Sequence, residues 1–154
     1  MKSNVSLVGA GVDSTILDFG TNDASLVATG TASSIIQNFK IVNLTAQNSG
    51  PSDGGVIDIR FSDFWIMDNV KTTTSTKGFT IQDCQDFIMF NCLAISNTGN
   101  GFEINATNSR ATQKYSLVNC RASSNSGIGF SINPNSNDMF YGSLVGCRSS
   151  SNTG

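Results

Sequence analysis

The residues of this chain that could do chemistry are few. Its 154 residues contain no histidine, four cysteines and eleven acidic residues, and Glu103 is the only glutamate. Without histidine, neither a Ser-His-Asp triad nor a Cys-His pair can form. A zinc site is disfavoured as well, because no Cys-x-x-Cys pair occurs. Carboxylate chemistry remains, and Glu103 and Asp58 are the candidate catalytic residues.

Glu103 and Asp58 occupy equivalent positions in a short block that occurs four times. In each copy apolar residues alternate with polar ones, which indicates a β-strand; the copies are Val56–Ile59, Gly78–Ile81, Gly101–Ile104 and Gly129–Ile132. If the copies stack as neighbouring strands, Asp58 and Glu103 lie two strands, or about 9.6 Å, apart. That separation is at the outer limit of the roughly 6.5–9.5 Å between the two carboxyl groups of an inverting glycosidase.

The polar positions of these strands would form a face suited to carbohydrate. The candidate ligand-binding residues continue the column of Asp58 and Glu103 or lie two residues beyond it: Thr80, Ser131, Arg60, Gln82, Asn105 and Asn133. Their hydroxyl, amide and guanidinium groups can hydrogen-bond sugars. Three interpretations stay open: a polysaccharide-binding module, a hydrolase or lyase that degrades polysaccharide with Asp58 and Glu103, and a structural spacer without a ligand.

A second repeated block indicates which fold positions this face. Three copies align residue for residue, and diverged copies begin at Val5, Phe39 and Trp65; the aligned copies are Phe87–Gly99, Tyr115–Gly127 and Gly142–Gly154. Units of about 22–28 residues with short alternating runs are typical of β-helix coils. We therefore expect an all-β fold, a right-handed single-stranded parallel β-helix of about five to six coils. A β-sandwich is the alternative, but it would not explain the alignment.

One domain over residues 1–154 is expected, with an irregular first coil (1–38) and regular coils (39–154). Stacked coils turn each repeat position into a column. Two columns are predicted to form core, an aliphatic one and an aromatic one: Leu7, Ile41, Met67, Met89, Leu117 and Leu144; and Phe39, Trp65, Phe87 and Tyr115. A third column is predicted to form turns and consists of Asn43, Asn69, Asn91 and Asn119. A sugar-binding platform at Trp65 and Tyr115 is the alternative for the aromatic column. Cys92, Cys120 and Cys147 replace apolar residues, which favours buried free thiols over a disulfide.

A further column is apolar although the alternation places it outside. It contains Val8, Val42, Phe90, Val118 and Val145, with Asp68 as the exception. An apolar outer strip predicts a covering partner, either in a homotrimer or in the rest of a longer chain; an error in the assumed register would remove this strip. The sequence stops in mid-coil at Gly154, so we expect a fragment of a longer β-helix.

Charge and composition narrow the partners. The net charge is −2 and no basic cluster occurs in the sequence, which argues against nucleic acid. No apolar run approaches the ~18 residues of a membrane span, and the start of the chain lacks a signal peptide. No dense group of acids could supply the six to eight oxygens that calcium needs. We therefore expect no metal and no cofactor.

Two stretches carry a resemblance to a known family. The first coil, Asn4–Leu17, and the pattern Asn-Cys-x-Ala-x-x-Asn-x-Gly-x-Gly-Phe at 91–102 resemble the pectin-lyase-like superfamily of right-handed β-helices. The coils are most similar to those of bacteriophage tailspikes and mannuronan epimerase-like proteins. The resemblance implies a polysaccharide-binding module of a tailspike or surface adhesin, located outside the cell or on a virion. The Asp-Pro-His and Gly-His-Gly motifs of catalytic relatives are missing.

Overall fold

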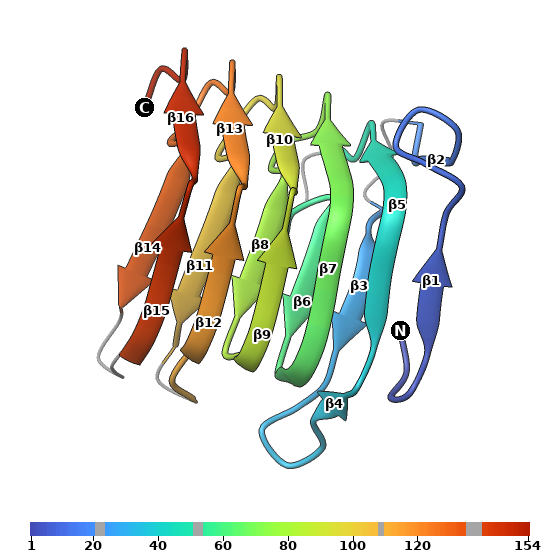
Figure 1. The fold of residues 1–154 in the computed structure, drawn as a ribbon, viewed down its shortest axis with the longest axis vertical. Helices are drawn as coiled ribbons and strands as arrows, with labels where there is room; N and C mark the ends of the chain where they lie inside the picture. Colours follow the sequence, from blue (N-terminus) through green and yellow to red (C-terminus); the bar gives the residue numbers. More distant parts are fainter. Residues whose placement is uncertain (21–23, 51–53, 108–109, 135–139) are drawn as a thin grey trace.

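The computed structural model is a parallel β-solenoid of about four turns, fewer than the five to six coils expected, and its described residues form no helix (Figure 1). It describes residues 1–20, 24–50, 54–107, 110–134 and 140–154. Strands that lie one coil apart in the sequence pair in parallel, so the all-β solenoid predicted from the repeats is confirmed.

Two sheets run along the solenoid. The smaller sheet has five strands: β3 (Leu26–Thr29), β6 (Ile57–Arg60), β8 (Phe79–Gln82), β11 (Phe102–Ala106) and β14 (Phe130–Pro134). The larger sheet has eleven: β1 (Ser6–Val8), β2 (Ile16–Asp18), β4 (Ile36–Gln37), β5 (Lys40–Gln47), β7 (Ser62–Thr73), β9 (Gln85–Phe90), β10 (Leu93–Ile95), β12 (Gln113–Val118), β13 (Arg121–Ser123), β15 (Phe140–Val145) and β16 (Arg148–Ser150).

Residues in the left-handed conformation form the corners of the coils. Asn43, Asn69, Asn91 and Asn119 all have φ between 50° and 57°, and Gly146 continues the column with φ 64°. Asparagine adopts this conformation more readily than most residues, and glycine adopts it without strain. The amide of Asn69 also donates to Oδ1 of Asn43 at 3.0 Å. The predicted role of this column as a turn is confirmed.

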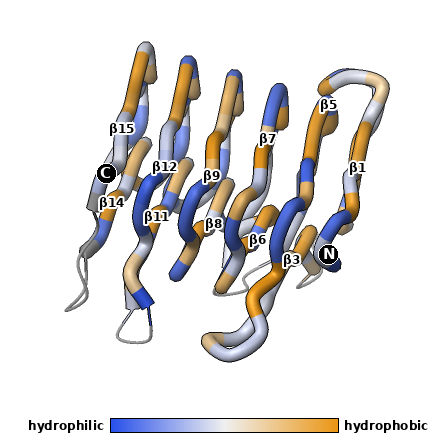
Figure 2. Tube along the Cα trace, turned by 60° about the horizontal axis from the view of Figure 1, so that its bottom comes forward, coloured by the Kyte–Doolittle hydropathy of each residue, from blue (hydrophilic) through white to orange (hydrophobic). Residues whose placement is uncertain are grey.

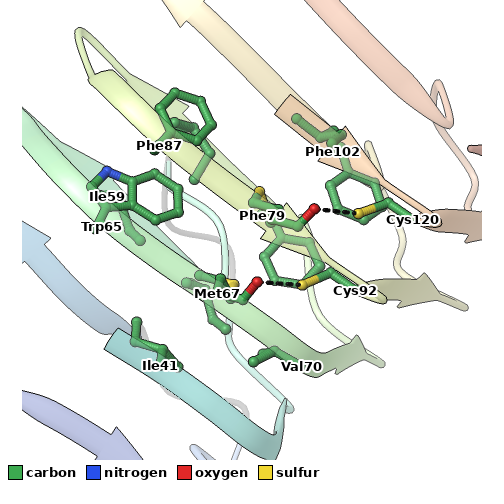
Figure 3. Close-up of a cluster of buried hydrophobic side chains, with 14 of the residues drawn as sticks. Ile41, Ile59, Trp65, Met67, Val70, Phe79, Phe87, Cys92, Phe102 and Cys120 are labelled. Atoms are coloured by element: carbon green, nitrogen blue, oxygen red, sulfur yellow. Dashed lines mark hydrogen bonds between the residues drawn. The ribbon is translucent and has the colours of Figure 1, made fainter. Parts of the chain in front are cut away.

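The predicted core columns point inward (Figure 3). Adjacent rings of the aromatic column stack with centroids 4.4–5.7 Å apart. Because Trp65 and Tyr115 are buried, neither offers a platform to sugars. The four middle members of the aliphatic column are also buried, whereas Leu7 is partly buried and Leu144 is exposed. These columns form the core together with the inward residues of the smaller sheet, such as Phe79 and Phe102, and this burial holds the coils together.

All four cysteines are free thiols, as the sequence favoured for Cys92, Cys120 and Cys147, but Cys147 is only partly buried. Cys92 and Cys120 are buried beside the aliphatic column, and each thiol lies within hydrogen-bonding distance of a carbonyl oxygen one coil away, that of Met67 or Met89 (Figure 3). Burial raises the pKa of Cys84 to about 12 and also raises that of Cys92. A thiol with so high a pKa is a poor nucleophile, so these two cysteines serve packing.

A second amide column, which the sequence did not suggest, lies inside the solenoid. Asn97 and Asn125 are buried, and the amide of Asn97 donates to Oδ1 of Asn125 at 3.0 Å. The amide of Asn125 donates in turn to Oδ1 of Asn152 at 2.9 Å. Each side chain satisfies a polar group of the next coil, which makes burial of an asparagine tolerable. These asparagines fix the corner that leads into the smaller sheet.

The outer apolar strip has the register that the sequence predicted. Val8 pairs with Val42, and Phe90 pairs with Val118, which pairs with Val145. Val8 and Val145 are 64% and 56% exposed, and Phe90 and Val118 are partly buried. Val42 is only 6% exposed, so the expectation that this residue lies on the outside is wrong.

Candidate functional site

The smaller sheet brings all eight candidate residues into two adjacent columns. Asp58 pairs with Thr80, Thr80 with Glu103, and Glu103 with Ser131. Two residues further along each strand, the second column runs Arg60, Gln82, Asn105 and Asn133. The alternate positions of these strands carry the apolar core, and Figure 2 shows this hydropathy pattern recurring in successive coils. The two columns therefore share the outward face of the sheet.

Asp58 is held by an ion pair within its own strand. Nε of Arg60 donates to the two carboxylate oxygens of Asp58 at 2.8 and 3.1 Å. The side chain of Asp58 is only 11% exposed, and that of Arg60 is 30% exposed. The pair therefore presents a partly covered carboxylate beside a more accessible guanidinium.

Glu103 is the centre of a hydrogen-bond network on the same face. Its carboxylate accepts from the amides of Asn100 and Asn105, each at 2.9 Å, and from Nζ of Lys77, with which it forms an ion pair. Burial by itself would raise the pKa of Glu103, but these donors outweigh it and lower the pKa below its ordinary value. Glu103 is therefore a fixed negative charge at neutral pH.

The lowered pKa of Glu103 makes a prediction about stability. A depressed pKa in the folded state contributes stability that is present above the unfolded value, 4.5, and is lost as the pH falls through the folded value. We expect Glu103→Gln to have a flatter stability–pH curve than the parent below pH 4.5, measured by urea unfolding at a series of pH values. Parallel curves for the two proteins would contradict the network. Asp13→Asn, at an exposed acid, is the matched control.

The remaining candidates differ in how accessible they are. Asn133 is exposed, and its amide donates to Oγ of Ser131 at 2.8 Å and to Oδ1 of Asn105 at 3.2 Å. Gln82 is partly buried, and Thr80 and Ser131 are buried. In the described part of the chain, the Thr80 hydroxyl has no hydrogen-bond partner. The accessible part of the face thus consists mainly of side-chain amides.

This arrangement suits binding better than acid catalysis. A glycosidase needs one carboxyl group with a raised pKa to protonate the leaving oxygen. Glu103 has the opposite shift, and Asp58 is bound by a guanidinium. The face can instead offer fixed donors and acceptors, with the carboxylates orienting the amides around them.

Two members of the network, Lys77 and Asn100, were not among the candidates. Both lie in the turn before a strand of the smaller sheet, each directly before the glycine that opens the repeated block. The alignment of Gly78 with Gly101 contained the signal that would have placed them in one column.

No family model matches the chain, and the comparisons with curated proteins and with solved structures found no match either.

Within the described ranges, no helix is long and apolar enough to span a membrane. The same residues contain no group of three or more His, Cys, Asp or Glu side chains that could hold a metal ion.

Proposed function

We propose that this solenoid is a polysaccharide-binding module and that the outward face of its smaller sheet contacts the glycan. The observation that carries the proposal is the register of the polar columns: amide, hydroxyl and charged groups recur at every strand of β6, β8, β11 and β14. A regular polymer presents its hydroxyls at regular intervals, so evenly spaced donors and acceptors can bind successive units. Hydrogen bonds among these side chains hold them in place before a ligand arrives, which lowers the entropic cost of binding.

We also propose a superfamily and a location for this chain. We infer that the chain is a pectin-lyase-like β-helix from a phage tailspike or surface adhesin, located outside the cell or on a virion. The parallel solenoid, the Asn-Cys-x-Ala repeat and the absence of histidine support a binding role within that superfamily. The homotrimer expected from the outer strip stays a prediction, supported by the exposure of Val8 and Val145.

A glycan array tests the proposal directly. We expect the parent protein to bind a neutral or weakly charged polysaccharide, and Gln82→Ala/Asn133→Ala to bind it at least about fivefold more weakly, because each lost hydrogen bond contributes about 0.5–1.5 kcal/mol. Ser6→Ala/Ser116→Ala, on the larger sheet, is the matched control and should bind normally. Binding to no glycan would favour the structural spacer. Release of reducing ends that Asp58→Asn/Glu103→Gln abolishes would favour the enzyme.

A further inference from the structure

The Lys and Arg side chains of this chain differ in whether they form ion pairs. Arg60, Lys77, Arg110 and Lys114 each form an ion pair with a carboxylate. In the described part of the chain, the other five Lys and Arg side chains form no ion pair: Lys2, Lys40, Lys71, Arg121 and Arg148. Three of these five lie in one column.

That column lies on the larger sheet, on strands β7, β10, β13 and β16, which stand side by side in Figure 1. Lys71 pairs with Leu93, Leu93 with Arg121, and Arg121 with Arg148. Arg121 and Arg148 are both exposed, and Lys71 is partly buried. Since adjacent strands lie about 4.8 Å apart, the two guanidinium groups start from backbones at that spacing.

Placing two arginines directly opposite each other disfavours folding. Like charges on paired strands repel, and among the described residues no carboxylate forms an ion pair with either arginine. An anion that bridged the two guanidinium groups would remove the repulsion and form charge-assisted, two-pronged hydrogen bonds. A bound anion therefore explains the two opposed arginines better than a contribution to stability does.

A hollow accompanies the two arginines. Arg121 and Arg148 line a cavity of about 300 Å³ together with Leu93, Asn119, Cys120 and Gly146. Gly146 occupies the corner position that Asn119 holds one coil earlier, and a Cβ at Gly146 would lie 2.6 Å from Oδ1 of Asn119. The glycine thus keeps side-chain atoms out of the hollow beside the cations.

We propose that Lys71, Arg121 and Arg148 bind an acidic polysaccharide through its carboxylate or sulfate groups. Charge complementarity selects a polyanion, and Thr73 and Ser150 of the flanking column add hydroxyls that can hydrogen-bond sugar. Leu93 offers an apolar surface to a sugar ring. The stripe is one residue wide on a chain of net charge −2, whereas nucleic acid requires a broad basic patch. This surface is separate from the amide face of the smaller sheet.

Binding of charged dextrans tests the proposal, because the sugar backbone is held constant. We expect carboxymethyl dextran and dextran sulfate to bind more tightly than unmodified dextran in calorimetry at low salt, and Arg121→Gln/Arg148→Gln to weaken both at least about tenfold. The double variant should fold with an unchanged or slightly raised melting temperature, since it removes like-charge repulsion. A preference for only one of the two charged dextrans identifies the anionic group.

Lys2→Gln/Lys40→Gln is the matched control, because it removes the same charge from exposed positions elsewhere. If the control variant bound the charged dextrans equally weakly, net charge alone would explain the effect and the proposed site would be overturned. If the protein bound a single-stranded oligonucleotide more tightly than either charged dextran, the ligand would be a nucleic acid and the assignment of a polysaccharide would be overturned. Gln82→Ala/Asn133→Ala should leave binding of the charged dextrans intact, so failure of this proposal and failure of the amide-face proposal can be told apart.

Discussion

Trp65→Ala is expected to destabilise the protein by about 3–5 kcal/mol. Trp65 is 1% exposed, and its ring stacks between Phe39 and Phe87 with centroids 5.7 and 4.4 Å away. Truncation leaves a cavity in the middle of the aromatic column, and the rings above and below are held by their own coils and cannot close it. Natural domains have about 5–15 kcal/mol of stability in total, so much of it would be lost.

The measurement is urea unfolding followed by far-UV circular dichroism, because Trp65 is the only tryptophan and its fluorescence disappears with it. Ile66→Ala is the control: Ile66 is the next residue of β7, points outward and is 41% exposed, so its loss should be below about 1 kcal/mol. Similar losses in the two variants would mean that the aromatic column does not carry the core.

Trp65→Phe separates ring packing from the indole N–H. In the described part of the chain, Nε1 of Trp65 is buried without a hydrogen-bond partner. Phenylalanine would continue the stack of Phe39 and Phe87 and remove that unsatisfied donor, which partly offsets the smaller volume. We expect a loss below about 1.5 kcal/mol. A loss as large as that of the alanine variant would show that indole volume alone matters.

The core could be predicted from the sequence because a solenoid repeats its contacts. Each residue of the aromatic column packs on the residue at the same position of the next coil, so aligning repeats is equivalent to predicting contacts. Phe79 and Phe102 illustrate this, because they align in the repeated block and their rings stack at 4.7 Å. The same reasoning gave the register of the polar columns around Asp58 and Glu103 correctly.

Contacts that fall outside the repeat could not be predicted. The partners of Glu103 include Lys77, whose position is Gly55 in the preceding coil and Asn100 in the next, so the repeat gives its column but not its ion pair. Val42 has the outward alternation of its column but is buried, a property that alternation alone does not reveal. Whether a carboxylate near the surface acts as an acid depends on such contacts, and residue type and spacing do not reveal them.

The ion pair of Asp63 with Arg110 is the extreme case, because 47 residues separate its partners. Asp63 lies in β7, and Arg110 precedes β12, two strands away across β9. The guanidinium binds both carboxylate oxygens, at 2.9 and 2.7 Å, and the side chains are 17% and 7% exposed. Asp63 also accepts from the backbone N–H of Gln85. One buried contact thus ties three successive coils together.

Arg110→Met is therefore expected to cost about 3–5 kcal/mol, because it leaves the Asp63 carboxylate buried without a cation. That loss corresponds to a fall in melting temperature of roughly 6–20 °C for a domain of this size. Thermal unfolding of Lys114→Met is the control. Lys114 approaches Asp86 only to 3.9 Å and is 57% exposed, so its removal should cost less than about 1 kcal/mol.

Asp63→Leu/Arg110→Met tests the cause of that loss. If an uncompensated charge destabilises the single variant, removing the carboxylate as well should recover most of the stability, since apolar side chains often replace a buried ion pair without loss. A double variant as unstable as Arg110→Met would instead assign the loss to two hydrogen bonds with the backbone. In these bonds the N–H of Gln85 donates to the Asp63 carboxylate, and the Arg110 guanidinium donates to the carbonyl oxygen of Asp83. In that case hydrogen bonds to the backbone would hold the coils together at this corner, and any pair of side chains that made the same hydrogen bonds could replace the ion pair.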